Sequence, residues 1–286
     1  MDYLKVLPQY LIPQHCLSRM VYRTARCQWA PLKNFLIKTF IHCFKVDMGL
    51  AQEPHAGNYI HFNHFFTREL KPAVRPIAQE QDVIVCPIDG YISQIGKINS
   101  GELFQAKNRS YDLDALLAVD NDMISSFKDG SFATFYISPK DYHRIHMPRD
   151  GQLTKMIYVP GRLFSVNTHT TRVVNRLFAR NERVISLFET DIGPMAIIMV
   201  GAMLVSSMET VWAGEITPAK KREITSHSYT EQNKKIKLQR GAEMGRFNMG
   251  STVILLFGKD TVTWLSELQA DQSVIMGMPL GKMNKN

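Results

Sequence analysis

Residues 249–257, MGSTVILLF, are the part of the sequence that says most about the fold. Gly-Ser-Thr has the composition of a turn, yet it leads directly into an uninterrupted apolar run rich in β-branched residues. Such a run predicts a buried strand that begins near Ser251. The strand would hold Ser251 on one side, while Gly250 would allow backbone freedom on the other. A reacting hydroxyl is well placed at such a boundary.

Short β-prone runs continue on the N-terminal side of this strand, back to about residue 80. They are separated by turn residues, and a single helical pattern, LDALLAV at 113–119, interrupts them. Strands in series with few helices predict an α+β protein with a mainly antiparallel sheet. The expected strands are DVIVC (82–86), YISQIGKI (91–98), SFATFYI (131–137), KMIYV (155–159), RVISLF (183–188), MAIIMVGAMLV (195–205) and STVILLF (251–257).

The first quarter of the chain is predicted to be helical. Apolar residues recur every three or four positions in 7–26 and in 31–46, and Pro31 suits the first turn of the second helix. This quarter carries +6 of the formal net charge of +8. Its basic residues and Trp29 suit a helix in an anionic lipid headgroup layer, but a helix packed on the protein's own core with a solvated basic face fits equally well. We therefore predict a helical region at 1–75 and a β-rich domain at 76–286.

The net charge and the cysteines indicate what kind of partner the protein binds and in which redox compartment it works. A pI near 9.3 favours an anionic partner, whether nucleic acid, acidic lipid or a phosphorylated substrate. The four cysteines form no C-x-x-C pair, and with the histidines they give no zinc-ligand spacing, so we expect no metal and a reducing compartment. The sequence contains no stretch of about 18 uncharged apolar residues, so we expect no membrane-spanning helix. The N-terminal residues do not have the pattern of an export signal, so we expect no export.

Candidate acid–base residues lie in SPKDYHRIHMPRDG, residues 138–151. His143 and His146 are three residues apart, so a helical turn would bring both imidazoles to one pocket, whereas a strand would send them to opposite sides. Asp141 lies beside them. Taken alone, each histidine is more often a surface or hydrogen-bonded core residue than a general acid or base.

A second candidate is Asp89 in CPIDGYI, where a Pro-x-Asp-Gly turn joins two apolar runs. Asp-Gly is ordinary hairpin chemistry. An aspartate held in a rigid turn also suits the task of orienting a histidine. Asp89, His146 and Ser251 would then form a triad, although many proteins of this size contain such a trio, and the serine does not lie in a G-x-S-x-G motif.

These same segments resemble the bacterial phosphatidylserine decarboxylases, and the likeness runs nearly from end to end. It includes KVDM (45–48), FNHFFTRELKPAVRPI (62–77), PIDGYISQIGKI (87–98), SPKDYHRIHMP (138–148), YVPGRLFSVN (158–167), LFARNERV (177–184), ETVWAGEITP (209–218) and EMGRFNMGSTVILLF (243–257). The usual leucine before Gly-Ser-Thr is Met249 here, a swap of similar volume. Residues after 258 carry little of the resemblance.

The resemblance implies a chain that cuts itself between Gly250 and Ser251, into a large subunit (1–250) and a small one (251–286) that stay together as a heterodimer. Ser251 attacks the Gly250 carbonyl, with His146 as base and Asp89 as its orienting partner, and the residue becomes a pyruvoyl group. Asp141 is a competing orienter. The ketone forms a Schiff base with an amine substrate and accepts the electrons released by decarboxylation.

The substrate implied is phosphatidylserine and the product phosphatidylethanolamine, made in phospholipid biosynthesis. His143 is the candidate proton donor, and Tyr136 and His143 are candidate substrate contacts. The resemblance also implies a peripheral enzyme on an anionic membrane, at the cytoplasmic face of the bacterial inner membrane. It implies no nucleic acid and leaves a homo-oligomer open. The alternatives are a serine hydrolase that uses the same triad and a non-catalytic, basic membrane-binding protein.

Overall fold

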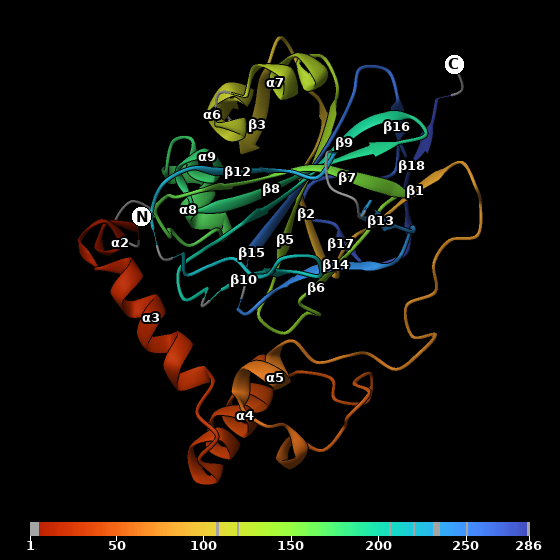
Figure 1. The fold of residues 1–286 in the computed structure, drawn as a ribbon. Coiled ribbons are helices and arrows are strands. Elements are labelled where there is room, and N and C mark those ends of the chain that lie inside the picture. The colour runs from red at the N-terminus through yellow and green to blue at the C-terminus, as the bar shows by residue number, and fades with distance from the viewer. Residues whose placement is uncertain are drawn as a thin grey trace.

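The computed structural model describes residues 6–106, 109–118, 120–205, 207–219, 221–230, 235–249 and 251–284, and of Ser251 only the backbone. Helices come first along the chain and strands follow (Figure 1), which confirms the predicted α+β class. The boundary predicted between 75 and 76 stays a prediction.

A nine-stranded sheet forms the centre of the described molecule, and all of its pairs are antiparallel. Its second strand, β7, also pairs with β13 (Lys237–Leu238). The order across the sheet is β12 (Thr225–Ser228), β7 (Gly151–Val159), β8 (Arg183–Thr190), β9 (Gly193–Val200), β15 (Ser251–Phe257), β5 (Ser131–Ile137), β2 (Gly90–Lys97) and β17 (Ser273–Val274).

The strand that follows Gly250 is central in this sheet. β15 pairs with β5 along its whole length and with β9 from Thr252 onward. The side chains from Val253 to Phe257 are fully buried, and burying each stabilises the fold by roughly 1.5–3 kcal/mol. The predicted limits of β5 and β15 are confirmed, whereas β9 ends at Val200, five residues before the end of the predicted run.

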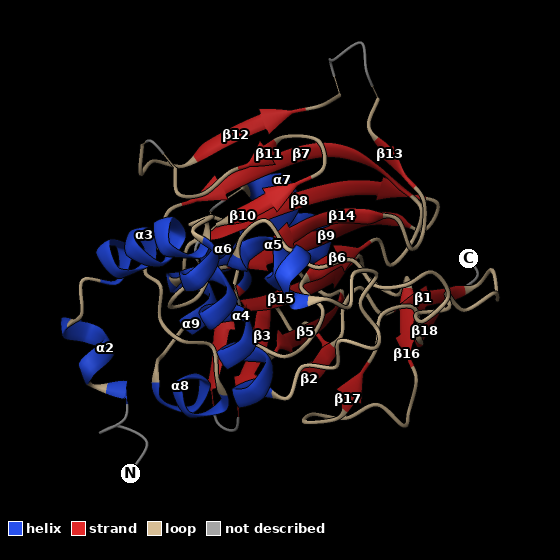
Figure 2. Ribbon diagram, turned by 90° about the horizontal axis from the view of Figure 1, so that it is seen from below, coloured by secondary structure: helices blue, strands red, loops and turns tan. Residues whose placement is uncertain are grey.

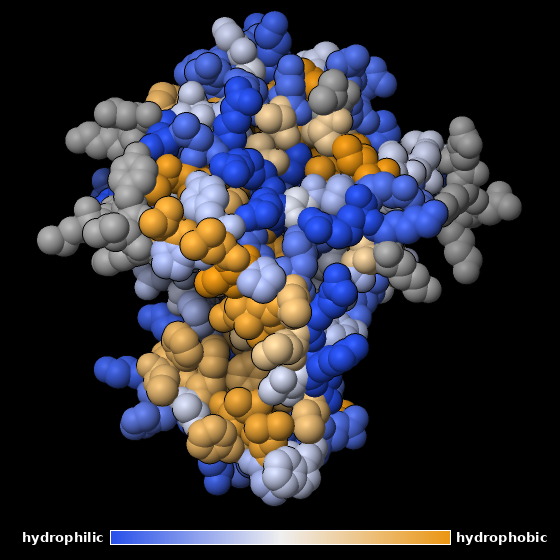
Figure 3. All heavy atoms as spheres, turned by 90° about the vertical axis from the view of Figure 1, so that its left-hand side faces the viewer, coloured by the Kyte–Doolittle hydropathy of each residue, from blue (hydrophilic) through white to orange (hydrophobic). Residues whose placement is uncertain are grey.

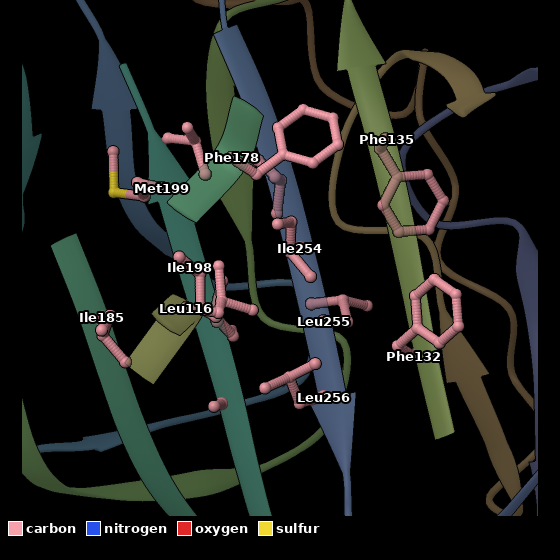
Figure 4. Close-up of a cluster of buried hydrophobic side chains, with 14 of the residues drawn as sticks. Leu116, Phe132, Phe135, Phe178, Ile185, Ile198, Met199, Ile254, Leu255 and Leu256 are labelled. Carbon is pink, nitrogen blue, oxygen red and sulfur yellow. The ribbon is translucent and has the colours of Figure 1, made fainter. Parts of the chain in front are cut away.

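Smaller sheets and short helices complete this part of the fold. Leu116 and Phe178, from two of the helices, lie among side chains of β5, β8, β9 and β15 in the main hydrophobic core (Figure 4). The further elements are β11 (Gly214–Glu215), β10 (Met208–Thr210), β14 (Glu243–Phe247) and β6 (Arg144–His146) in one sheet; β1 (Val83–Val85), β18 (Pro279–Met283) and β16 (Val262–Trp264) in another; the pair β3 (Glu102–Ala106) and β4 (Arg109–Asp112); and helices α6 (Leu113–Leu117), α7 (Asn121–Phe127), α8 (Thr168–Val173) and α9 (Leu177–Arg180).

In Figure 1, α2 lies to the left of the sheets, α3 descends from it, and α4 and α5 lie below the sheets at one end of the molecule. Pro31 lies in the first turn of the second long helix, as predicted. The helices α4 and α5 form a separate small core that includes Ile37, Phe62 and Phe65. These elements are α2 (Pro8–Leu11), α3 (Gln14–Ala25), α4 (Ala30–Phe44), the 3-10 turn η1 (Ala56–Asn58) and α5 (Phe62–Phe66).

Hydrogen bonds fasten α2 and α3 to the β-rich part. Gln14 accepts from the backbone N–H of Leu163 at 2.9 Å, and Tyr22 donates to Glu215 at 2.8 Å. Arg26 also pairs with Glu215. Seen from below, α3 lies to one side of the strands, whereas α4 and α5 lie in front of them (Figure 2). The described residues include no helix that is both long and apolar enough to cross a membrane.

Candidate functional site

The residues on either side of Gly250 lie where the β-rich part meets the N-terminal helices. Ser251 is the first residue of β15 and pairs with Ile137 of β5. Gly250 lies outside the described residues. Met249, just before it, has a φ of 142°, a backbone conformation that costs a residue with a Cβ on the order of 1–3 kcal/mol. The backbone is thus strained one residue ahead of the predicted cut.

Met249 is also tied to the helical core. Its side chain packs with the α4–α5 cluster. One residue earlier, Asn248 accepts a hydrogen bond from Asn63 of α5 at 2.9 Å, and its backbone N–H donates to the Ser207 carbonyl at 2.9 Å. The segment leading into the triplet is therefore held from both sides, by a helix and by a loop of the β-rich part.

His143 is fully buried immediately before β6. Its Nδ1 lies 2.8 Å from the backbone carbonyl of Asp141, and its ring packs on Phe66 with 4.0 Å between centroids. Because burial penalises the charged imidazole, the pKa of His143 falls to about 3. The ring is neutral, and its Nε2 has no hydrogen-bond partner within the described part of the chain.

His146 ends β6 and is held by two contacts. Nδ1 lies 2.8 Å from the Gly241 carbonyl, and Nε2 lies 3.1 Å from the hydroxyl of Tyr142. Nδ1 therefore carries the proton and donates, while Nε2 carries the lone pair and accepts from Tyr142. Burial lowers the pKa of His146. A neutral imidazole with its lone pair on Nε2 is in the form that a general base requires.

His146 ends strand β6 and His143 lies immediately before it, so the two histidines are not in a helical turn, and their side chains have different neighbours. This is the second of the two outcomes weighed for residues 138–151. His143 contacts Phe66, whereas His146 stacks on Tyr142 and reaches Gly241. A strand at this place separates two imidazoles that are close in sequence.

Asp89 is buried in the turn before β2, and its carboxylate is paired with Arg75. Nε of Arg75 lies 2.9 Å from both carboxylate oxygens, and the backbone N–H of Met276 donates to Oδ1 at 2.9 Å. The glycine that follows is required, because a Cβ at Gly90 would lie 2.2 Å from the Tyr136 carbonyl oxygen. The Asp-Gly pair thus serves close strand packing as well as placing the carboxylate.

Asp141 accepts a hydrogen bond from the backbone N–H of Ser138 at 2.9 Å, and burial raises the pKa of its carboxyl group. In the described structure neither Asp89 nor Asp141 makes a side-chain hydrogen bond to His143 or His146. These contacts therefore do not identify which of the two carboxylates orients His146. The choice of Asp89 remains a prediction.

A cavity of about 240 Å³ brings the two aspartates together. It lies between the segment after α4, the residues after α5 and the 138–142 loop. Tyr142, which contacts His146, also lines it, so the cavity lies next to both histidine segments. Its charged and polar lining includes Arg68, Arg75, Asp89, Lys140, Asp141 and Tyr142.

Tyr136 is placed differently from His143. It lies on β5 opposite Thr252 of β15 and Tyr91 of β2, and it lines a separate cavity of about 470 Å³ with Gln105 and Arg172. Burial, together with the charge of Asp141, raises the pKa of the phenol. The two candidate substrate contacts therefore do not share a described cavity, and the role of Tyr136 stays a prediction.

An apolar groove of about 360 Å³ runs between α3 and α4, and Met249 lines it. Several apolar side chains around it are solvent-exposed: Met20 is 62% exposed, Phe35 65% and Trp29 66%. Figure 3 shows hydrophobic side chains gathered over the lower half of this face, where the N-terminal helices lie. An apolar surface thus borders the segment that leads into the triplet.

Comparison with known proteins connects this arrangement with a family. The family profile described as phosphatidylserine decarboxylase matches residues 62–282, which include every part of the site from α5 to β15. The chain belongs to the phosphatidylserine decarboxylase family. A second profile, described as PSD, matches residues 4–45, so the N-terminal helices have counterparts in relatives as well.

Curated relatives in this decarboxylase family are similar along their full length. All three below are named phosphatidylserine decarboxylase proenzyme. The protein of Ectopseudomonas mendocina is 52% identical over 277 residues, covering 96% of each chain. That of Stutzerimonas stutzeri is 51% identical over 98% of this chain and 95% of the relative, and that of Pseudoalteromonas translucida is 48% identical over 99% of both.

Sequence reasoning did not find all of the site. It selected Asp89, His143 and His146 but missed their partners Arg75, Tyr142 and Gly241. Tyr142 lies between the two selected histidines, and its place in that motif was the one available signal. Gly241 is 95 residues from His146 and is brought to it only by the pairing of β6 with β14.

Proposed function

We propose that the chain is made as a proenzyme, cuts itself between Gly250 and Ser251, and then converts phosphatidylserine to phosphatidylethanolamine and CO2. Membership of the phosphatidylserine decarboxylase family supports this, and so does the curated relatives' name, proenzyme. The observation that carries the proposal for this chain is the strained backbone of Met249, one residue ahead of the predicted cut. The buried His146, with its lone pair on Nε2, is the proposed base.

The self-cutting follows from ordinary acyl chemistry. Ser251 Oγ attacks the carbonyl carbon of Gly250 while His146 Nε2, once released from the Tyr142 hydroxyl, takes its proton, and the peptide bond is replaced by an ester. Elimination across Ser251 breaks its Cβ–Oγ bond and releases the Gly250 carboxylate. Water then converts the dehydroalanine to a ketone with loss of ammonia. Asp89 is proposed to favour the protonated imidazole by its charge.

The local residues fit a pyruvoyl group at position 251. That group supplies an electron sink for decarboxylation without an added cofactor. His143 is neutral because burial lowers its pKa, and its Nε2 has no partner within the described part of the chain. With the Nδ1 proton held by the Asp141 carbonyl, Nε2 carries the lone pair, so His143 would take up a proton on Nε2 before passing it to the substrate carbon. The adjoining Phe66 excludes water from that side of the imidazole.

Intact-protein mass spectrometry tests the proposal. The wild-type chain should give two fragments, of which the smaller begins with a pyruvoyl group and lacks an N-terminal amine. Ser251→Ala should remain a single 32.7 kDa chain, and His146→Ala should be severely slowed in processing. His55→Ala is a matched control, because the His55 side chain is 79% exposed and lies outside the site.

Two outcomes contradict the proposal. An unmodified Ser251 in the active wild-type protein would favour a serine hydrolase instead. Normal processing of His146→Ala would remove that residue from the role of base. Release of CO2 from carboxyl-labelled phosphatidylserine by the processed wild type, and its absence in Ser251→Ala, completes the test.

We also propose that the enzyme is a peripheral protein of the cytoplasmic face of a bacterial inner membrane. The exposed Phe35 and Trp29, with the apolar groove between α3 and α4, would enter the lipid. Nearby Arg19, Arg23 and Lys38 would meet anionic headgroups, each contributing on the order of 1 kcal/mol. Flotation with anionic liposomes should weaken with salt, and binding indifferent to salt and to lipid charge would refute the electrostatic part.

A further inference from the structure

Arg68 is a buried cation whose hydrogen-bonding capacity is largely unused. The residue is 5% exposed and follows α5 by two positions. One nitrogen, Nη2, donates to the backbone carbonyl of Lys140 at 2.9 Å. Nε and Nη1 are buried and have no hydrogen-bond partner within the described part of the chain. The guanidinium also lies 5.5 Å from the ring centroid of Phe65.

Such an arrangement is costly unless an anion completes it. A buried charge with unpaired donors loses the solvation that water would give, and burial indeed lowers the pKa of Arg68. Three carboxylates lie near enough to favour the charged guanidinium, but among the residues described none makes a hydrogen bond with it: Asp89 is paired with Arg75, Asp141 accepts from Ser138, and Asp47 accepts from the backbone N–H of Gly49. If Arg68 served only to pack α5, an apolar side chain of similar length would do so at lower cost.

The unused donors belong to a residue that lines the 240 Å³ cavity beside the histidine segments. Tyr142, another lining residue, contacts His146, and the backbone carbonyl of Asp141 holds His143. Of the four cations that line the cavity, Lys45 and Lys140 are solvent-exposed and Arg75 is committed to Asp89. Among the described residues that line the cavity, Arg68 is therefore the buried cation with donors left for an anionic group.

We propose that Arg68 binds the phosphate of the substrate lipid's headgroup and so sets the position of the headgroup in this cavity. The inference rests on the decarboxylase function proposed above. A guanidinium fork matches two non-bridging phosphate oxygens and binds them with charge-assisted hydrogen bonds. The cavity is large enough for a headgroup. Within the described part of the chain it shares no lining residue with the apolar groove, and that groove suits the lipid tails.

The phosphate, rather than the substrate carboxylate, is the anion assigned to Arg68. The carboxylate loses its charge as CO2 leaves, so an ion pair to it would stabilise the starting state more than the transition state and slow the reaction. The phosphodiester keeps its charge from substrate to product. Arg68 therefore contributes uniform binding, which affects KM and leaves kcat nearly unchanged.

The test compares Arg68→Gln and Arg68→Lys with Lys259→Gln. The control variant also removes one positive charge, from an exposed turn beyond the far end of β15. Processing is measured first by intact mass, because self-cutting needs no phosphate. Kinetics on phosphatidylserine in mixed micelles follow. We expect normal processing, a KM raised about ten- to hundredfold in Arg68→Gln and less in Arg68→Lys, and a kcat within about twofold of wild type.

Soluble probes identify the group that Arg68 binds. Glycerophosphoethanolamine, which carries the phosphodiester, should inhibit the wild type and lose about tenfold or more of its inhibition in Arg68→Gln. Ethanolamine, which lacks phosphate, should inhibit both proteins equally. Inorganic phosphate that inhibits the wild type as strongly as glycerophosphoethanolamine would overturn the headgroup assignment and indicate a site for free phosphate.

Other results are equally decisive. An unchanged KM in Arg68→Gln, or a loss confined to kcat, would overturn the proposal. Failure of processing in both Arg68 variants would assign Arg68 a structural role instead. These outcomes differ from failure of the decarboxylase function itself, in which the wild type would neither form two chains nor release CO2.

Discussion

The pairing of Arg75 with Asp89 should be a large single contribution to the stability of the fold. The pair joins the segment after α5 to the turn before β2, and the side chains are only 15% and 8% exposed. Arg75→Met leaves the Asp89 carboxylate buried with one remaining donor, the backbone N–H of Met276. Stranding a buried charge costs about 3–5 kcal/mol. We expect about 3 kcal/mol, because the partly exposed Arg75 position admits some water.

The measurement is thermal unfolding followed by circular dichroism, in a Ser251→Ala background so that one uncut chain unfolds. For a protein of this size, about 3 kcal/mol corresponds to a fall in Tm of roughly 6–12 °C. The double variant Arg75→Met with Asp89→Asn removes the stranded charge and should recover most of that loss. A fall below about 2 °C for Arg75→Met, or no recovery in the double variant, would refute this account of the pair.

Three further predictions concern other buried or exposed groups. Burial lowers the pKa of His143 from 6.5 to about 3. Between these two pH values the unfolded chain therefore binds a proton that the folded chain does not. This group leaves the free energy of unfolding unchanged above pH 6.5 and lowers it by about 1.4 kcal/mol per pH unit as the pH drops toward 3. His143→Asn in the Ser251→Ala background should flatten that acid limb in urea titrations, and an unchanged limb would contradict the buried neutral imidazole. Arg183 is 2% exposed, and its side chain donates to the backbone carbonyls of Leu116, Ala179, Asn181 and Ala115. Arg183→Met should lower the free energy of unfolding by more than about 3 kcal/mol in thermal unfolding. A loss under about 1 kcal/mol would show that water replaces these hydrogen bonds. Phe35→Ser should weaken flotation with anionic liposomes yet shift the stability by no more than about 0.5 kcal/mol, since the ring is already 65% exposed; equal flotation would exclude Phe35 from the lipid contact.

Much of the secondary structure could be predicted from local sequence patterns. The limits of β5 and β15 follow from runs of mostly apolar residues without charges, because a strand buried on both faces favours apolar side chains on both. The helices near residues 14–25 and 30–44 follow from apolar residues at three- and four-residue intervals, and Pro31 marks the start of the second. The end of β9 was missed, because residues 201–205 remain apolar after the chain has left the sheet.

The sequence also supplied the candidate site residues, through motifs that are local: the Gly-Ser-Thr triplet, the two histidines and the Asp-Gly turn. It also determined membership of the decarboxylase family, since the motifs occur in order along the chain. What a short motif cannot specify is the partner of each side chain. His146 could be assigned as a base from its type, but not its proton position, which depends on the Gly241 carbonyl.

Only the tertiary structure decided those partners. Strand pairing brings Gly241 to His146, the turn before β2 meets Arg75, and α5 sets Phe66 against His143. The same packing leaves Arg68 buried beside the cavity, with two donors that find no partner among the residues described. Hydrophobic periodicity is a property of neighbouring residues and can be read along the chain, whereas hydrogen-bond partners and pKa shifts depend on burial by segments far away in sequence.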